Sequence, residues 1–167
     1  GNDASTRNEF YKTITQDVKT DILLVQEITS QIGVDGFLVN VLKTFSPNYN
    51  KGAFLDGPDS DNAIFYDTTK FDYLSNTAYP TELRTINLFQ VRHKVTLDTL
   101  FIFSVHLKAS TGATNEAQRG REVDVLRGVT NNYPPGRNFL VCGDFNIYGS
   151  TEVAYQKLKA VTAGTQG

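Results

Sequence analysis

Three apolar runs in the sequence end in polar residues whose types could support hydrolytic chemistry. Glu27 closes the first run, His106 follows the second, and Asp144 and Asn146 follow the third, in Gly143-Asp144-Phe145-Asn146. A carboxylate can hold a hard cation such as Mg²⁺, which prefers oxygen ligands. An imidazole can donate to a phosphate oxygen or protonate a leaving group, and an aspartate can orient water. Together these residues form an inventory for metal-assisted attack of water on phosphorus.

Each of these residues also has a structural explanation when it is taken alone. Glu27 could be a carboxylate that reaches solvent at a strand end, and His106 a hydrogen-bonded histidine at a strand end. Asp144 and Asn146 could be turn residues, because Asp and Asn are common in turns. Lys108 could contact phosphate or could be an exposed surface lysine.

The chemistry depends on the elements that position these side chains. The runs before Glu27, His106 and Gly143 are short, continuous and apolar, as in strands that are covered on both faces. The second strand, Val95–His106, a helix over Asn115–Val129 and the third strand, Asn138–Cys142, together have the length of a crossover unit. Because α/β folds bind ligands just past the carboxyl ends of buried strands, we expect the polar residues to converge there.

The rest of the chain is predicted to contain both helices and strands. Apolar spacing at Phe10, Ile14 and Val18 predicts a helix over Ser5–Thr20 with one apolar stripe. Ser150 is the predicted N-cap of a last helix that ends at Ala160. A helix over Val34–Phe45 and further strands are also predicted, the strands at Ala63–Tyr66, Phe71–Leu74 and Ile86–Val91.

Bulk properties restrict the class of protein. The chain has 167 residues, which suits one domain, and an apolar fraction of 40% that fits a globular core. Its formal net charge of −2 gives no support for a broad basic face of the kind that grips long nucleic acid. No run is long enough for a transmembrane helix, and the lone Cys142 is expected to be a small buried residue.

Three stretches, taken in order, resemble the endonuclease/exonuclease/phosphatase family. They are Asp21-Ile22-Leu23-Leu24-Val25-Gln26-Glu27-Ile28, Ser104-Val105-His106-Leu107-Lys108 and Gly143-Asp144-Phe145-Asn146. The segment Asn62-Ala63-Ile64-Phe65-Tyr66 and the position of Arg119 are also similar to the family pattern. The resemblance covers nearly the whole chain and is carried by the ordered set rather than by any one motif.

The resemblance implies an α/β (α+β) fold of two packed, mostly antiparallel β-sheets with helices on the outer faces. It implies Mg²⁺-dependent hydrolysis of phosphate esters, with Mn²⁺ as an alternative metal and Glu27 as the metal ligand. His106 would contact the scissile phosphate, Asp144 would orient or deprotonate the attacking water, and Asn146 would lie beside it. Lys108 and Arg119 would contact the phosphate of the substrate, which could be a nucleic acid, a phospholipid or an inositol phosphate.

The chain also departs from the family pattern. The family has a strand with an Asn motif before the first helix, and further strands with a Ser-Asp-His type motif near its end. Residues 1–167 are therefore expected to form a single, incomplete four-layer sandwich that lacks the first and the last strands. We expect this chain to be weak or inactive alone, with a second copy or another chain covering its open strand edges. The alternative function is a non-catalytic binding module on the same fold.

Overall fold

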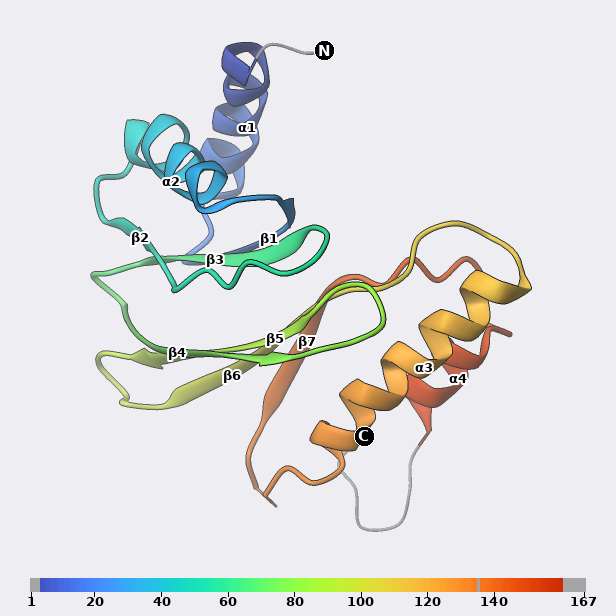
Figure 1. Cartoon of the computed structure of the whole chain (residues 1–167). Coiled ribbons are helices and arrows are strands. Elements are labelled where there is room, and N and C mark those ends of the chain that lie inside the picture. The colour runs from blue at the N-terminus through green and yellow to red at the C-terminus, as the bar shows by residue number, and fades with distance from the viewer. Residues whose placement is uncertain (1–3, 135, 161–167) are drawn as a thin grey trace.

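The computed structural model describes residues 4–134 and 136–160, which form two β-sheets flanked by helices (Figure 1). A three-stranded sheet has the order β1-β3-β2, and a four-stranded sheet has the order β4-β5-β6-β7. The strands are β1 (Ile22–Ile28), β2 (Tyr49–Lys51), β3 (Asp61–Asp67), β4 (Phe71–Tyr79), β5 (Ile86–His93), β6 (Thr99–His106) and β7 (Phe139–Asp144). The helices are α1 (Ala4–Val18), α2 (Gln31–Asn40), α3 (Ala113–Thr130) and α4 (Val153–Lys159), with a 3₁₀ turn over Leu42–Thr44.

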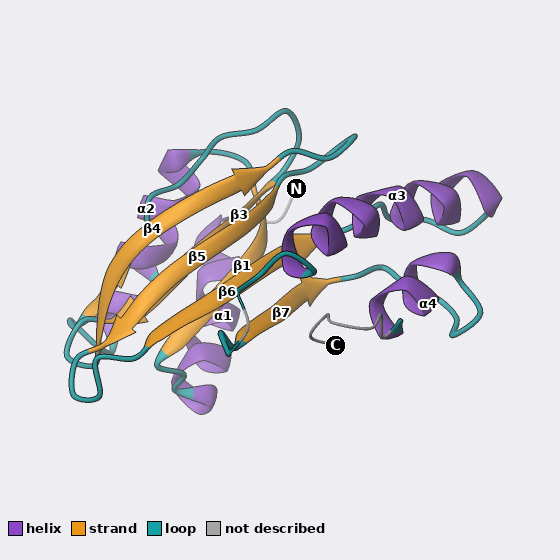
Figure 2. Ribbon diagram, turned by 90° about the horizontal axis from the view of Figure 1, so that it is seen from below, coloured by secondary structure: helices purple, strands orange, loops and turns teal. Residues whose placement is uncertain are grey.

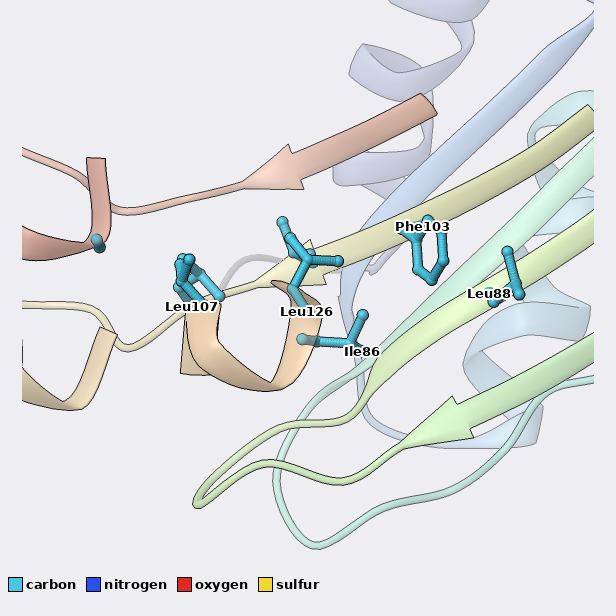
Figure 3. Packing of buried hydrophobic residues seen from close by; sticks show 8 residues of the cluster. Ile86, Leu88, Phe103, Leu107 and Leu126 are labelled. Atoms are coloured by element: carbon cyan, nitrogen blue, oxygen red, sulfur yellow. The ribbon is translucent and has the colours of Figure 1, made fainter. Parts of the chain in front are cut away.

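The two sheets stack face to face, and helices cover their outer faces. In Figure 1, α1 and α2 lie above the three-stranded sheet, and α3 and α4 lie together on the other side of the molecule. Buried residues of α2 pack against β3, and buried residues of α3 pack against β5 and β6 (Figure 3). The predicted α/β sandwich of two mostly antiparallel sheets is therefore confirmed.

Side-chain alternation along β6 explains how one strand serves two cores. Phe103 and Val105 face α3, whereas Ile102 faces the layer between the sheets. Successive side chains of a strand point to opposite faces of the sheet, so Ser104 and His106 lie on the same face as Ile102. His106, the last residue of β6, is thus directed into the layer between the sheets.

The predicted crossover unit is also confirmed. Strand β6, helix α3 and strand β7 follow one another, and β6 and β7 pair in parallel at the edge of the four-stranded sheet (Figure 2). In this register His106 is directly opposite Asp144. The parallel pairing therefore brings residues 38 positions apart in sequence to the same edge.

Some predicted boundaries were wrong. The strand predicted from Val95 starts at Thr99, because residues 94–96 form a turn and the Leu97 N–H donates to the His93 carbonyl. Val95 is consequently 84% exposed. The helix predicted over residues 34–45 instead runs from Gln31 to Asn40, starting from the N-cap Ser30.

The last helix also starts later than predicted. Ser150 is not its N-cap, since α4 begins at Val153 after the N-cap Glu152. The Glu152 side chain makes no capping hydrogen bond and instead accepts from the Tyr148 N–H. Residues 150 and 151 instead form a turn before the helix.

The predicted apolar stripe of α1 is exposed. Phe10, Ile14 and Val18 all have most of their side chains in contact with solvent among the described residues. Strands β1 and β7 each have one unpaired edge in the described sheets. None of the described helices combines the length and apolar character that crossing a membrane requires.

Candidate active site

The layer between the sheets changes from apolar to polar along its length. Most of the layer is an apolar cluster that includes Ile64, Phe89 and Ile102. Toward the carboxyl ends of β1, β6 and β7, buried polar residues replace the apolar ones: Asn62, Asn87, Ser104 and His106. Strands β3 and β5 run antiparallel to β1 and β6, respectively, so their amino ends contribute to the same region. We refer to this region as the polar end of the layer.

Hydrogen bonds between the sheets fix the polar end. The Asn62 side-chain amide donates to the Asn87 side-chain carbonyl and to the Thr85 backbone carbonyl, both at 2.9 Å. The Gln26 amide donates to the Ser104 hydroxyl at 3.2 Å. Since a buried polar group without a partner is costly, these bonds stabilise the polar interior and restrict its side chains.

His106 is buried at the end of β6. Its side chain is only 3% exposed, and its Nε2 lies 4.0 Å from Asp144 Oδ2. Its Nδ1 has no hydrogen-bond partner among the described residues. Burial lowers the pKa of His106 below its ordinary value, as does the nearby Arg84 guanidinium, although Asp144 and Glu27 oppose this. The imidazole is therefore neutral at neutral pH, and one ring nitrogen can donate a hydrogen bond.

Asp144 and Asn146 are held by the turn that leaves β7. The Asn146 N–H donates to Asp144 Oδ1 at 2.9 Å, and the Asn146 side-chain amide donates to the Leu107 carbonyl at 3.0 Å. Gly143 has a positive φ of 134°, and a Cβ there would lie 2.0 Å from the Val105 carbonyl oxygen. Only glycine fits this approach of β7 to β6, which sets Asp144 beside His106.

Glu27 lies at a bulge near the end of β1. Its φ of 64° is positive, and the pairing register of β1 with β3 shifts between Val25 and Ile28. Its carboxylate is exposed and contributes to the electrostatic environment of His106. The bulge thus directs a carboxylate out of the strand pattern, which bulges often do near functional sites.

Sequence reasoning missed Arg84 and Asp59. Arg84 Nε lies 2.9 Å from Asp59 Oδ2, and its Nη1 donates to the Leu107 carbonyl at 3.3 Å. The Arg84 side chain is only 14% exposed, and its charge acts on His106. Both residues lie in connecting segments without hydrophobic periodicity, so no sequence signal distinguished them from other loop residues.

Arg119 occupies a different environment from the one predicted. Instead of facing substrate, its fully buried guanidinium donates to Glu152 Oε2 at 2.9 Å and to the carbonyls of Lys108 and Ser110 at 2.9 and 2.8 Å. We therefore revise its predicted role from a substrate contact to a structural one. The Arg119 charge is tolerated on the buried side of α3 because a carboxylate and two carbonyls satisfy its donors.

Lys108 lies in the loop that follows His106. Its N–H donates to Glu122 Oε2 at 2.8 Å, so its backbone is fixed, while its half-buried ammonium makes no hydrogen bond or ion pair within residues 4–134 and 136–160. The predicted contact of Lys108 with a substrate phosphate is compatible with this position and stays a prediction.

The described residues do not form a closed metal site. Within the described residues no group of three or more His, Cys, Asp or Glu side chains could hold a metal ion. Mg²⁺ commonly keeps several waters and takes only one or two protein carboxylates together with substrate phosphates. The exposed carboxylate of Glu27 fits that minimal requirement, but it does not form a closed cage.

Sequence comparisons and structural comparisons gave different results. No protein-family model matches the chain, and no curated protein matches it in sequence. The structure is similar to an endonuclease/exonuclease/phosphatase family protein from Bacteroides thetaiotaomicron, with a TM-score of 0.70, 18% identity and coverage of 92% of this chain and 58% of that one.

Two further solved structures have the same arrangement. The mannosyl-6-phosphatase Bt3783 of Bacteroides thetaiotaomicron gives a TM-score of 0.70 at 19% identity, covering 92% of this chain and 61% of that one. TDP2 from D. rerio, in complex with a single-strand DNA product, gives 0.65 at 16% identity, covering 89% and 56%.

The chain thus spans about three fifths of the length of the solved chains that it matches. At this level of identity the likeness establishes architecture. Within residues 4–134 and 136–160, the chain has the fold of the endonuclease/exonuclease/phosphatase proteins, as its sequence motifs predicted.

Proposed function

We propose that this chain carries the catalytic groups of a metal-dependent phosphate-ester hydrolase. The observation that supports this most strongly is the placement of His106 beside Asp144. The two side chains lie 4.0 Å apart on adjacent parallel strands, at the polar end of a layer that is otherwise apolar. They are close enough to act on one bound group, yet they are not hydrogen-bonded to each other.

His106 would bind the scissile phosphate. A neutral, buried imidazole can donate a hydrogen bond to a phosphate oxygen without carrying a charge that would need its own counter-ion. Burial and Arg84 lower its pKa, which favours that neutral form. As negative charge develops in the transition state, a fixed donor of this kind stabilises it with little reorganisation.

Asp144 would orient and deprotonate the attacking water. Its carboxylate is 53% exposed, so water can reach it, while the Asn146 N–H holds Oδ1 and leaves Oδ2 on the side of His106. Because the Asn146 amide nitrogen is committed to the Leu107 carbonyl, the Asn146 side-chain oxygen is available to a water or a ligand.

Glu27 would hold the metal, with Mg²⁺ or Mn²⁺ as the candidates. Bound beside a phosphate, such an ion acts as a Lewis acid that polarises a phosphate oxygen. Its remaining ligands would be waters and substrate oxygens. Lys108, in the loop that follows His106, would then provide a point charge for the substrate phosphate.

The substrate class is a phosphodiester or phosphomonoester. Among the similar structures, one is a mannosyl-6-phosphatase and another, TDP2, contains a single-strand DNA product. Those proteins are longer than this chain, so their additional residues could supply further ligands. We therefore propose that these 167 residues hydrolyse phosphate esters weakly when they act alone.

Hydrolysis of bis(p-nitrophenyl) phosphate and of plasmid DNA, with and without Mg²⁺, tests this function. The chain and the product of its complete reading frame should be compared, with Glu27→Gln, His106→Ala and Asp144→Asn variants of each. Asp98→Asn is a matched control, because Asp98 is an exposed carboxylate in the turn at the opposite end of β6.

We expect metal-dependent turnover that each site substitution lowers by at least about a hundredfold, through loss of the metal ligand at Glu27, of the phosphate donor at His106 or of the base at Asp144. The Asp98 variant should keep full activity. Robust turnover by the 167 residues alone would contradict the proposal of weak activity. No turnover of diesters, monoesters or lipid phosphates by either protein would favour the non-catalytic binding module.

A further inference from the structure

Two loops leave the carboxyl ends of β6 and β7 and border the proposed site. The β6–α3 loop comprises residues 107–112, directly after His106, and the β7–α4 loop comprises residues 145–152, directly after Asp144. Neither loop contains regular secondary structure. Contacts outside regular secondary structure therefore fix the positions of these loops, and they affect the geometry of the two catalytic groups.

A buried ion pair joins the loops. Arg119 on α3 has no exposed surface, and its Nη2 lies 2.8 Å from Glu152 Oε2, whose side chain is 6% exposed. The same guanidinium donates to the carbonyls of Lys108 and Ser110, at 2.9 and 2.8 Å. One buried cation thus contacts both loops, donating to a carboxylate of one and to two backbone carbonyls of the other.

Tyr148 adds a second connection between the same loops. Its hydroxyl accepts the Ser110 N–H at 3.2 Å, and its own N–H donates to Glu152 Oε1 at 2.8 Å. The Arg119 guanidinium lies over its ring, 5.2 Å from the centroid. Burial alone would raise the pKa of Glu152, but the Tyr148 N–H and Arg119 together hold that pKa below its ordinary value. Glu152 is therefore charged at neutral pH.

The network ends at the catalytic strand termini. Next to it, the Leu107 N–H donates to the Asp144 carbonyl at 2.9 Å, and the Asn146 side chain donates to the Leu107 carbonyl. Leu107 is itself buried in the core beneath α3 (Figure 3). Displacement of either loop would therefore shift the backbone that carries His106 or Asp144.

We infer that Arg119 and Glu152 are positioning residues that keep His106 and Asp144 in register by locking the two loops together. The coupling of the loops follows from the contacts above, whereas its effect on catalysis rests on the proposed function. A buried ion pair adds little to stability relative to apolar residues of similar volume, but removal of one partner leaves an uncompensated charge. Such a pair is consequently suited to fixing geometry.

Hydrogen exchange of the Lys108 and Ser110 amides in a Glu152→Gln variant tests the coupling. Glutamine keeps an oxygen that can accept the Tyr148 N–H, so the substitution mainly removes the charge opposite Arg119. Neither measured amide bonds to Glu152, so any faster exchange must be transmitted through Arg119 or Tyr148. The matched control is Glu82→Gln, which breaks the exposed ion pair between Glu82, in the β4–β5 connection, and Arg121 of the same helix α3.

We expect exchange of both amides to become at least about tenfold faster in Glu152→Gln, while the Phe103 amide in β6 changes less than about threefold. Glu82→Gln should leave all three unchanged. If exchange becomes equally faster at the loop and strand amides, the Arg119–Glu152 pair contributes only to global stability, and the inference is overturned. Unchanged exchange at the loop amides would also overturn it.

A rescue series separates positioning from simple filling of space. Arg119→Lys keeps a cation for Glu152 and one donor for the loop carbonyls, whereas Arg119→Met fills similar volume without charge. The NMR titration of the His106 ring should shift toward the ordinary histidine pKa in the Met variant, because a displaced loop admits water, and should return toward the native midpoint in the Lys variant. Identical titration of the His106 ring in both variants would contradict a positioning role.

Hydrolysis of bis(p-nitrophenyl) phosphate distinguishes failure of this inference from failure of the proposed function. If the unsubstituted protein is active, kcat should fall at least about tenfold in Glu152→Gln with KM changed less than about twofold. Unchanged kcat with mobile loops would show that the coupling does not serve catalysis. If the unsubstituted protein is inactive, the proposed function fails, while hydrogen exchange still decides whether the loops are coupled.

Discussion

The layer between the two sheets has an apolar end and a polar end, and the same strands supply both. Along β6, Ile102 belongs to the apolar cluster, and Ser104 and His106 follow on the same face. Along β5, Phe89 lies in the cluster, and Asn87 lies in the polar end. On each strand, two side chains that are two residues apart on the same face therefore lie in different environments, one apolar and one polar.

The two ends place different requirements on the side chains that fill them. The apolar end requires only close packing, and apolar side chains of similar volume can provide it. The polar end requires a partner for each donor and acceptor, and two of its atoms, Asn62 Oδ1 and His106 Nδ1, have none within the described residues. Substitutions at the polar end therefore change hydrogen bonding as well as packing, whereas those at the apolar end change packing.

The largest predicted effect is at the junction where β7 enters the polar end. In Gly143→Ala the new Cβ would lie 2.0 Å from the Val105 carbonyl oxygen, on a backbone with a φ of 134°. We expect a loss of more than about 4 kcal/mol in the free energy of unfolding, which urea denaturation followed by circular dichroism would measure. Gly128→Ala is the control, because nothing lies near its added Cβ and it should change stability by less than about 1 kcal/mol. Equal stability of the two variants would contradict the described strand approach.

A large effect is also expected at the apolar end. Phe89 is fully buried between the sheets, so Phe89→Ala should cost about 3–5 kcal/mol through lost burial and the resulting cavity. Phe10→Ala is the matched control, since Phe10 is 66% exposed and should contribute little. Urea denaturation of both variants measures the difference. A cost for Phe10 comparable to that for Phe89 would show that α1 is covered in solution.

A smaller cost is expected at the polar end. Asn62→Ala removes the donor to Asn87 Oδ1 and the Thr85 carbonyl, which should cost about 1–3 kcal/mol. Replacing both Asn62 and Asn87 by Leu should cost less than the sum of the Asn62→Ala and Asn87→Ala changes, because the Asn62–Asn87 bond is lost only once, while the Thr85 carbonyl and Asn76 Oδ1 still lose their donors. Urea denaturation measures all three variants. Strict additivity of the two Ala changes in the double variant would mean that the Asn62–Asn87 bond does not couple the two sheets.

The smallest effect is a change in the pH dependence of stability. The pKa of His106 is lowered in the folded chain, first by burial and then by Arg84, so the unfolded chain binds a proton at higher pH than the folded chain does. Stability attributable to His106 is therefore present above the unfolded pKa of about 6.5 and is lost as pH falls through 6.5 toward the lower folded pKa.

Unfolding midpoints between about pH 8 and about pH 5.5 test this difference. His106→Gln should lose less stability on acidification than the unsubstituted chain. A His106→Gln slope equal to that of the unsubstituted chain would mean that the histidine is not buried in its neutral form.

The sequence predicted the architecture because its main signals are local. Continuous apolar runs identified β1, β6 and β7, and the polar residues that follow them converge as the crossover rule requires. Turn chemistry limited the precision of these predictions. The residues around Val95 favour a strand. However, the His93 N–H donates to the Asp98 carbonyl and closes a turn, so β6 begins only at Thr99.

The candidate site was less predictable where side chains choose partners that are distant in sequence. Arg119 and Glu152 are 33 residues apart, and Arg84 and Asp59 lie in different loops. The spacing of residues along the sequence does not indicate which counter-ion a buried charge will meet, because tertiary packing determines the pairing. The strand-end residues were found because their position follows from the strands, whereas the ion-paired residues were misassigned or missed.

The most direct test of the central claim is to map where a phosphate ester binds. Backbone and histidine NMR signals of the chain should be followed while phenyl phosphate is added in the presence of Mg²⁺. Binding at the polar end predicts shifts at Glu27, His106 and Asp144 to Asn146, with little change at Phe89 or Val91 in the apolar end, and weaker shifts in His106→Ala. Shifts centred elsewhere, or no shifts at millimolar ligand, would contradict the assignment of the polar end as the active site.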